Sequence, residues 1–449
     1  ELRINYSSAI IMKYPAKITK LYLLKLSIPI FFSNLAIPLV GVVDTSLMGH
    51  LSSSSFLAAA SIATSIMTMI LWSFGFLRMG TVGLVAQSLG KGDYREIVLI
   101  TLRNISIACV ISILIILMKS PILIIIENYF NTSKETFDLI KKYISVRILS
   151  APAELVIYVF VGLYLGLQKT KISSLLIIFY SILNILLSIY FVKNLDLEIY
   201  GVALGTVLSS YVTVFIFTLF TYFYFKNNFN IIPRYRKVFV FKKLLKLLSI
   251  NFDLFIRTVL LTFAFLWITY QSSKLGEEYL AANTILLQFI VISAFFLDAY
   301  AFSTEGVVGY SLGRKIKKSF LSVVSSSFQL SFYTSLIISL IYLLFYKNII
   351  NVLTDLDYIK FIAYGFIFWV IIIPPFASLS YQFDGIFIGT SQTAEIRNSM
   401  IISVILYIII SIYLIKFFNN NGIWLSLLVL MILRSLTLNL YFFRILRKF

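Results

Sequence analysis

Long apolar runs alternate with short, polar and mostly basic connections along the whole chain. A helix needs about 20 predominantly apolar residues to cross a bilayer, and twelve runs have this character. Strands do not fit runs this long and this apolar. We therefore predict an all-α integral membrane protein with twelve transmembrane helices, centred near Ala36, Met67, Val110, Ile157, Leu183, Phe215, Leu261, Val291, Leu336, Val370, Leu406 and Leu430.

The composition agrees with a membrane protein and removes several other classes. The 449 residues are 60% hydrophobic and 13% charged, whereas soluble domains are about 25% charged. The net charge of +19 lies in the connections between apolar runs, so it does not indicate nucleic-acid binding. One Cys and one His cannot build a tetrahedral nitrogen and sulfur site. We expect no metal and no cofactor.

The basic residues also predict the orientation in the membrane. The connections that share the N-terminus's side of the membrane contain more than twice as many Lys and Arg residues as the connections on the other side. Positive charge favours the cytoplasm. We therefore expect both termini in the cytoplasm, in a bacterial inner membrane, and a monomer.

An internal repeat divides the chain into two halves. One constant shift, without gaps, superposes Leu57–Gly90 on Leu280–Gly313, and this repeat shift also aligns Pro152 with Pro375, Gly162 with Gly385, Gly166 with Gly389 and Thr170 with Thr393. Two six-helix bundles of equal orientation would be related by a pseudo-two-fold axis along the membrane normal, as in alternating-access transporters. Duplication for packing alone is the other interpretation. We expect a cytoplasmic tail (1–20), a first lobe (21–226), a basic cytoplasmic linker (227–243) and a second lobe (244–449).

Six acidic residues fall inside the predicted spans: Asp44, Glu154, Asp253, Asp298, Glu305 and Asp384. A charge at the centre of a span costs about 2.5–3.5 kcal/mol on insertion scales. Such carboxylates either pair with a cation or become neutral by taking up a proton. The second behaviour would make a proton carrier. No G-x-x-x-x-G-K-[ST] motif occurs, so we expect an ion gradient, not ATP bound at a P-loop, to supply the energy.

Asp44 is the strongest candidate for reversible protonation. No other charged residue lies between Pro38 and His50, and no cation stands at helical spacing from Asp44. Pro29 and Pro38 belong to the same span, and each removes a backbone donor and can kink the helix. A bent first helix that carries this carboxylate is our candidate for a moving element.

The remaining acids have possible partners. Asp253 precedes Arg257 by one turn, the favourable order for a structural ion pair. Asp384 and Arg397 stand on either side of a turn, as a gate pair would. Asp298 and Glu305 are seven residues apart, on one helix face and separated by about 10 Å. They line a polar cavity in the second half or pack against polar partners.

Several strings in both halves resemble one family. The segment 38–50, Pro-Leu-Val-Gly-Val-Val-Asp-Thr-Ser-Leu-Met-Gly-His, resembles the first-span motif of the multidrug and toxic compound extrusion (MATE) family. Further strings are similar to its DinF-like branch: 74–87, 255–258, 281–283, 297–305 and 383–389. The resemblance implies two six-helix bundles that open alternately to each side. It also implies a secondary antiporter that exports amphipathic, cationic organic compounds in exchange for protons, with sodium as the alternative coupling ion.

The resemblance also implies site residues. The family's first-helix carboxylate falls on Asp44, and its fifth-helix asparagine falls on Asn184. A second carboxylate usually follows one turn later, where this chain has Ser188. We hypothesise that Glu154 replaces it. We expect the substrate cavity to include Asp298, Glu305, Asn283, Gln288 and Tyr158, and aromatic rings suit flat organic cations.

Two rival functions stay open at this point. A flippase for a lipid-linked substrate would need cations in its cleft, for which Arg78, Arg147 and Arg257 are available. A membrane enzyme would need acids or His in a sizeable loop outside the membrane. The longest such stretch, the basic linker, has no acid, His or Cys. We therefore expect no enzyme and no catalytic residues, and as partners only small organic substrates and the lipid bilayer.

Overall fold

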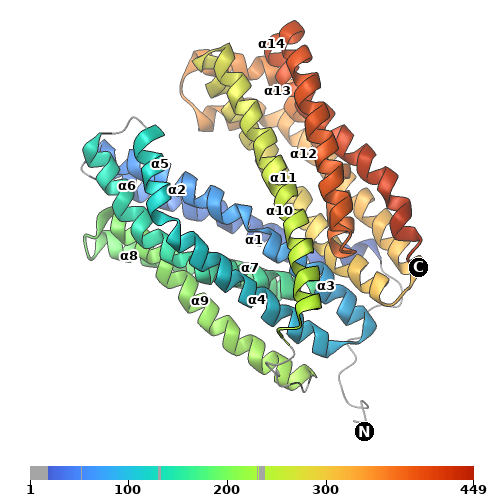
Figure 1. Cartoon of the computed structure of the whole chain (residues 1–449). Coiled ribbons are helices and arrows are strands. Elements are labelled where there is room, and N and C mark those ends of the chain that lie inside the picture. The colour runs from blue at the N-terminus through green and yellow to red at the C-terminus, as the bar shows by residue number, and fades with distance from the viewer. Residues whose placement is uncertain (1–18, 52, 130–132, 230, 232–237) are drawn as a thin grey trace, which may run out of the picture. The chain divides into compact units, whose positions relative to one another are not determined.

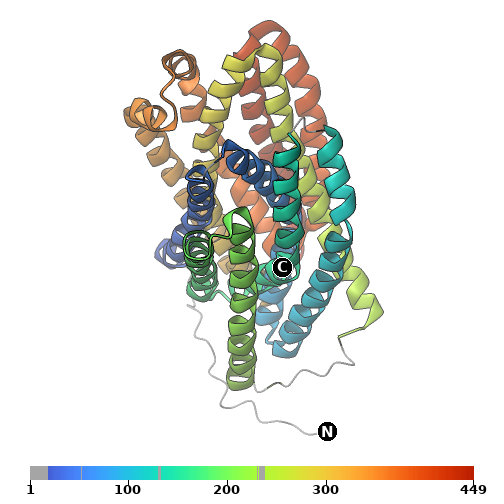
Figure 2. The same ribbon diagram turned by 90° about the vertical axis from the view of Figure 1, so that its left-hand side faces the viewer.

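The computed structural model describes residues 19–51, 53–129, 133–229, 231 and 238–449. Figures 1 and 2 show coiled ribbons and no arrows over these residues. The helices are α1 (Lys20–Gly49), α2 (Ser54–Ser73), α3 (Phe76–Lys91), α4 (Tyr94–Leu117), α5 (Lys119–Tyr129), α6 (Lys134–Arg147), the 3-10 helix η1 (Ile148–Ser150), α7 (Ala151–Gly166), α8 (Thr170–Lys193), α9 (Glu198–Phe229), α10 (Phe241–Leu275), α11 (Glu277–Gly313), α12 (Lys317–Leu353), α13 (Asp357–Gly389) and α14 (Thr393–Leu446).

These helices account for all twelve predicted spans. Eleven stretches of the described residues are long and apolar enough to cross a membrane. One of them, α14, has 54 residues and breaks at Asn419, whose φ of 48° and ψ of −126° are not helical. The break separates the two spans predicted near Leu406 and Leu430. The all-helical membrane fold predicted from the hydrophobic pattern is therefore confirmed.

The chain forms two compact units. Unit 1 includes Phe32–Leu247, and unit 2 includes Leu248–Phe449 together with the described part of 17–31. The predicted cytoplasmic tail, apart from residues 19 and 20, lies outside the described residues, as do residues 230 and 232–237 of the predicted linker. The predicted first lobe contains the whole first helix, whereas the structure divides α1 after Phe31.

Specific contacts explain why the beginning of α1 belongs to unit 2. The hydroxyls of Ser27 and Ser303 on α11 are 2.8 Å apart and share a hydrogen bond. The ring of Phe31 stands edge-on to Tyr300, with centroids 5.1 Å apart, and also contacts Phe296. These neighbours lie in the other half of the sequence, so the pattern of apolar runs does not predict these contacts.

The repeat found in the sequence recurs in the helix boundaries. α4, α6 and α8 begin at residues 94, 134 and 170, and α12, α13 and α14 begin at 317, 357 and 393, where the repeat shift places their equivalents. The turns between helices repeat as well. Left-handed backbone occurs at Gly92 and Gln168 in the first half, and at the equivalent residues Lys315 and Ser391 in the second.

Each unit is organised around one helix of the repeat. α7 packs against α3, α4, α8 and α9, and α13 packs against α11, α12 and α14 (Figure 1). A Cβ at Gly162 would lie 2.5 Å from the carbonyl oxygen of Arg78, and a Cβ at Gly385 would lie 2.7 Å from that of Ala301, the equivalent of Arg78. The same close approach recurs one turn later, between Gly166 and Val82 and between Gly389 and Glu305. Small residues at spacing four thus let the same two helices pack closely in both halves.

Candidate coupling site and ion-pair network

Two contacts align α1 and α8 in parallel within unit 1. Ser33 on α1 donates a hydrogen bond to Ser174 on α8, at 3.3 Å between the hydroxyl oxygens. Asp44 follows Ser33 by eleven residues, and Ser188 follows Ser174 by fourteen, so with a helical rise of about 1.5 Å per residue they reach similar levels. The Ser188 hydroxyl lies near the carboxyl of Asp44, but neither it nor Oδ1 of Asp44 makes a hydrogen bond of regular geometry within the described residues.

Four buried polar atoms on α1 and α8 lack hydrogen-bond partners among the described residues: Oδ1 of Asp44, Oδ1 of Asn184 and the hydroxyls of Ser181 and Ser188. The three α8 residues share one face of that helix, at spacings of three and four. Nδ2 of Asn184 donates to Thr206 on α9, at 3.0 Å, which fixes the amide and leaves its oxygen free. Buried polar atoms normally have partners. This cluster, which we call the Asp44 cluster, is therefore suited to a proton or a cation.

An ion pair stands next to the Asp44 cluster. Nη1 of Arg147, at the end of α6, lies 2.5 Å from Oε1 of Glu154 on α7, and it also donates to Ser150 in η1. Arg147 interacts electrostatically with Asp44, and both interact with Tyr143. Glu154, the predicted second acid, thus has a guanidinium partner.

The predicted kink residues lie within continuous helix. α1 is helical from Lys20 to Gly49, through Pro29 and Pro38. The bend remains a prediction. His50, directly after α1, is exposed, and its Nδ1 lies 2.7 Å from the carbonyl oxygen of Ser46.

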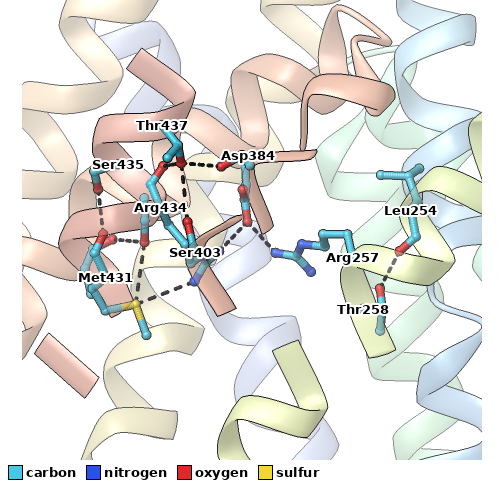
Figure 3. A network of polar contacts seen from close by, with 12 residues as sticks. Leu254, Arg257, Thr258, Asp384, Ser403, Met431, Arg434, Ser435 and Thr437 are labelled. Atoms are coloured by element: carbon cyan, nitrogen blue, oxygen red, sulfur yellow. Dashed lines mark hydrogen bonds and ion pairs between the residues drawn. The ribbon is translucent and has the colours of Figure 1, made fainter. Parts of the chain in front are cut away.

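In unit 2 the carboxylate of Asp384 joins three helices. Figure 3 shows it between Arg257 of α10 and Arg434 of α14. Nη2 of Arg434 lies 2.7 Å from Oδ2 of Asp384, and Nη2 of Arg257 contacts the same oxygen. Asp384 is 5% exposed and Arg434 is 2% exposed. Nη1 of Arg434 also contacts the sulfur of Met431, at 3.5 Å. Two guanidiniums thus share one oxygen of this carboxylate.

The structure corrects the ion pairs expected from sequence spacing. Asp253 does not pair with Arg257: its Oδ1 accepts from Nη1 of Arg397, at 2.6 Å, and its Oδ2 accepts from Thr393, at 2.9 Å. Asp384 pairs with Arg257, not with Arg397. The four residues therefore exchange partners, because the side chains of Asp253 and Arg257 reach from α10 to α14 and α13 and not to each other.

Asn283, which we predict in the substrate cavity, is buried and fully hydrogen-bonded. Nδ2 donates to Ser272 and to Asn420, at 2.8 and 2.6 Å, and Oδ1 accepts from Asn420 and from Nε1 of Trp424, at 3.1 and 2.9 Å. Both amide hydrogens and both lone pairs are used, so no polar group of this side chain is left for a substrate. It ties α10 and α11 to the start of the second segment of α14.

The other predicted cavity residues occupy different environments. Asp298 is half-buried and interacts electrostatically with Arg257 and with Tyr381. Glu305 is 1% exposed, at the contact between α11 and α13. Gln288 is exposed on α11, and Tyr158 is half-buried beside the pair of Arg147 and Glu154.

Sequence reasoning missed three features of these sites. The sequence pattern points neither to Arg434 nor to Thr206, and it does not match Arg147 with Glu154. The last pair was detectable, because seven residues are about two helical turns.

Within the described residues, no group of three or more His, Cys, Asp or Glu side chains could hold a metal ion.

Comparisons with known proteins agree on one family. The MatE family model matches residues 29–190 and 254–439. DNA damage-inducible protein F of Escherichia coli (strain K12) is 30% identical over 413 residues, which cover 92% of this chain and 90% of that protein. Multidrug export protein MepA of Staphylococcus saprophyticus is 24% identical over 206 residues, 46% of this chain and 45% of that protein.

Solved structures share the fold. The structure titled "Outward-facing conformation of a multidrug resistance MATE family transporter of the MOP superfamily" aligns with a TM-score of 0.85 at 18% identity, over 96% of each chain. The family resemblance predicted from the motifs is confirmed. The chain is a multi-pass membrane protein that belongs to the MatE family, the multidrug and toxic compound extrusion transporters.

Proposed function

We propose that this protein is a proton-coupled antiporter that exports amphipathic organic cations, with Asp44 as the residue at which proton and cation exchange. The observation that carries this proposal is the Asp44 cluster, in which one carboxylate oxygen and three further polar atoms are buried without partners among the described residues. The names of relatives such as MepA, a multidrug export protein, support the substrate class.

The exchange follows from competition for one carboxylate. A proton that binds Asp44 removes its charge and releases a bound cation, and loss of the proton restores the cation site. Exchange of one proton for one monovalent cation moves no net charge. The pH gradient, worth about 1.4 kcal/mol per unit, is then the driving force, and the membrane potential contributes nothing.

The alternative functions have less support from the charges. A flippase for a lipid-linked phosphate needs cations that are free to bind it, but two of its three candidate arginines are paired, Arg147 with Glu154 and Arg257 with Asp384. Sodium coupling at Asp384 would need a carboxylate that is free to bind a cation, and Asp384 already contacts two guanidiniums. Both observations favour proton exchange in the first half.

The setting we propose is a bacterial inner membrane, with both termini in the cytoplasm and the monomer as the working unit. The excess of Lys and Arg in alternate connections supports the orientation. Alternating access of two repeated halves is the proposed transport cycle.

The experiment is efflux of ethidium, a fluorescent monovalent cation, from proteoliposomes under an imposed pH gradient. Asp44→Asn should abolish gradient-driven efflux, while the control Asp357→Asn should transport normally, because Asp357 is 95% exposed in its side chain. Efflux driven by a sodium gradient in place of the pH gradient would support the alternative coupling ion. Normal transport by Asp44→Asn would refute the proposal.

A further inference from the structure

The ion pair of Arg147 and Glu154 is buried in unit 1, and the removal of its two charges from water costs free energy. Their side chains are 11% and 12% exposed. Replacement of a buried ion pair by apolar residues is often neutral or even stabilising. A pair retained within a membrane span therefore needs a reason other than stability.

The second half of the protein shows that the fold does not need this pair. The repeat shift places Val370 at the position of Arg147 and Ala377 at that of Glu154, and both are buried in α13. Pro375 stands where Pro152 stands. The repeat thus builds the same element with apolar side chains, and only the first half introduces charges.

The same shift shows that Asp44 and the pair of Arg147 and Glu154 are both absent from the equivalent positions of the second half. The equivalent of Asp44 in the second half is Trp267, whose Nε1 donates to Ser411, the equivalent of Ser188, at 2.9 Å. The half that lacks the carboxylate also lacks the arginine and the glutamate. This links the ion pair to the acid and not to the scaffold.

Arg147 lies at a break in the helix, with two carboxylates, Glu154 and Asp44, near its side chain. It ends α6, and the 3-10 segment η1 separates it from α7. Such a segment within a span often marks a functional hinge. The hydroxyl of Tyr211 on α9 donates to the carbonyl oxygen of Leu149 in this break, at 3.0 Å. Glu154 lies in direct contact with the guanidinium, and Asp44 lies within its electrostatic range.

We propose that Glu154 is a positioning residue that holds Arg147 away from Asp44, so that Asp44 stays available to protons and cationic substrates. Arg147 is a tethered cation that competes with the substrate for the same carboxylate. This inference rests on the proposed function of Asp44. The charged and titratable groups around Asp44 and this pair come from four helices: Arg78 on α3, Tyr143 on α6, Tyr158 on α7 and Tyr180 on α8.

The test measures ethidium binding to the purified protein as a function of pH, by fluorescence anisotropy. Glu154→Gln releases Arg147 to Asp44 and should weaken binding about tenfold, or about 1.4 kcal/mol. It should also move the pH at which protons displace ethidium. The double variant R147V/E154A, which installs the residues of the second half, should recover most of the affinity and the original pH profile.

Three results would overturn the inference. Glu154→Gln could bind like the wild type, or R147V/E154A could bind as weakly as Glu154→Gln, which would make the pair structural. Glu154→Gln could also weaken the residual binding of Asp44→Asn further, which would show an action that bypasses Asp44. If Asp44→Asn binds ethidium with wild-type affinity and pH profile, both the inference and the proposed function fail, whereas the first three results leave the proposed function intact.

Discussion

The two halves of this transporter share one skeleton and use their buried carboxylates in opposite ways. In the first half, Oδ1 of Asp44 is buried without a hydrogen-bond partner among the described residues. In the second half, Asp384 is buried between Arg257 and Arg434. The repeat positions do not coincide: Val161 is the equivalent of Asp384, and Trp267 is the equivalent of Asp44.

The difference is the one expected between a carboxylate that exchanges ions, as we propose for Asp44, and a structural one. A carboxylate between two guanidiniums faces twice its own charge, and the loss of its charge would deprive two buried cations of this shared anion. A carboxylate with an unpartnered oxygen loses little when it becomes neutral. Under the proposed function, the duplicated scaffold carries the exchanging carboxylate in one half and a fixed ion cluster in the other.

The sharpest way to break this comparison is to neutralise each carboxylate in turn. Asp384→Asn should lower the free energy of unfolding by about 3–5 kcal/mol, because it leaves Arg257 and Arg434 buried without their anion. Asp44→Asn should leave stability unchanged or raise it. Heating in detergent, followed by size-exclusion chromatography, measures both. Equal losses of stability would contradict the assignment of one acid to function and the other to structure.

A second variant gives the second half a residue of the first. Asn283→Ala installs the equivalent of Ala60 and leaves Asn420 and Trp424 without partners in the interior. We expect a loss of about 2–3 kcal/mol, since each buried unsatisfied group costs about 1–3 kcal/mol. Ethidium affinity should stay near that of the wild type. A large loss of ethidium affinity in a stable protein would support the prediction that Asn283 lies in the substrate cavity.

The glycine contacts test the likeness of the halves instead of their difference. Gly162→Ala and Gly385→Ala should each cost about 1–3 kcal/mol through overpacking, because the added methyl group meets a backbone carbonyl in both units. The two melting shifts should be similar. If only one variant is destabilised, the repeat does not extend to helix packing.

The smallest effect is expected at the partly exposed pair of Asp253 and Arg397. Arg397→Ser installs the equivalent of Ser174 and removes an ion pair whose arginine side chain is 32% exposed. Exposed pairs contribute about 0–1 kcal/mol, and Thr393 still donates to Asp253. We expect little change in melting and normal efflux. Loss of efflux in a stable protein would support the gate role predicted from sequence.

The fold could be predicted almost completely because its rules are local. Apolar runs indicate the spans, and one constant shift reveals the repeat and aligns the glycines whose close helix contacts the structure shows. The division of α1 after Phe31 could not be predicted, since the partners of Ser27 and Phe31 lie on α11, far along the chain.

The sites were predicted only in part, for the same reason. Asp44 and Asn184 stand out by helical position and by family resemblance, and they lie in one cluster. The partners of Asp253 and Asp384 lie 144 and 127 residues away. Spacing along one helix therefore suggested the wrong pairs. The hydrogen bonds of Asn283 with Asn420 and Trp424 could not be predicted either, because these partners are 137 and 141 residues away in sequence.

The most direct test of the account counts protons released when ethidium binds to the purified protein in weakly buffered solution. The account predicts that the wild type releases a proton for each cation bound and that R397S does the same. Asp44→Asn should release none. Proton release by Asp44→Asn equal to that of the wild type would place the exchange on another acid and contradict the central claim.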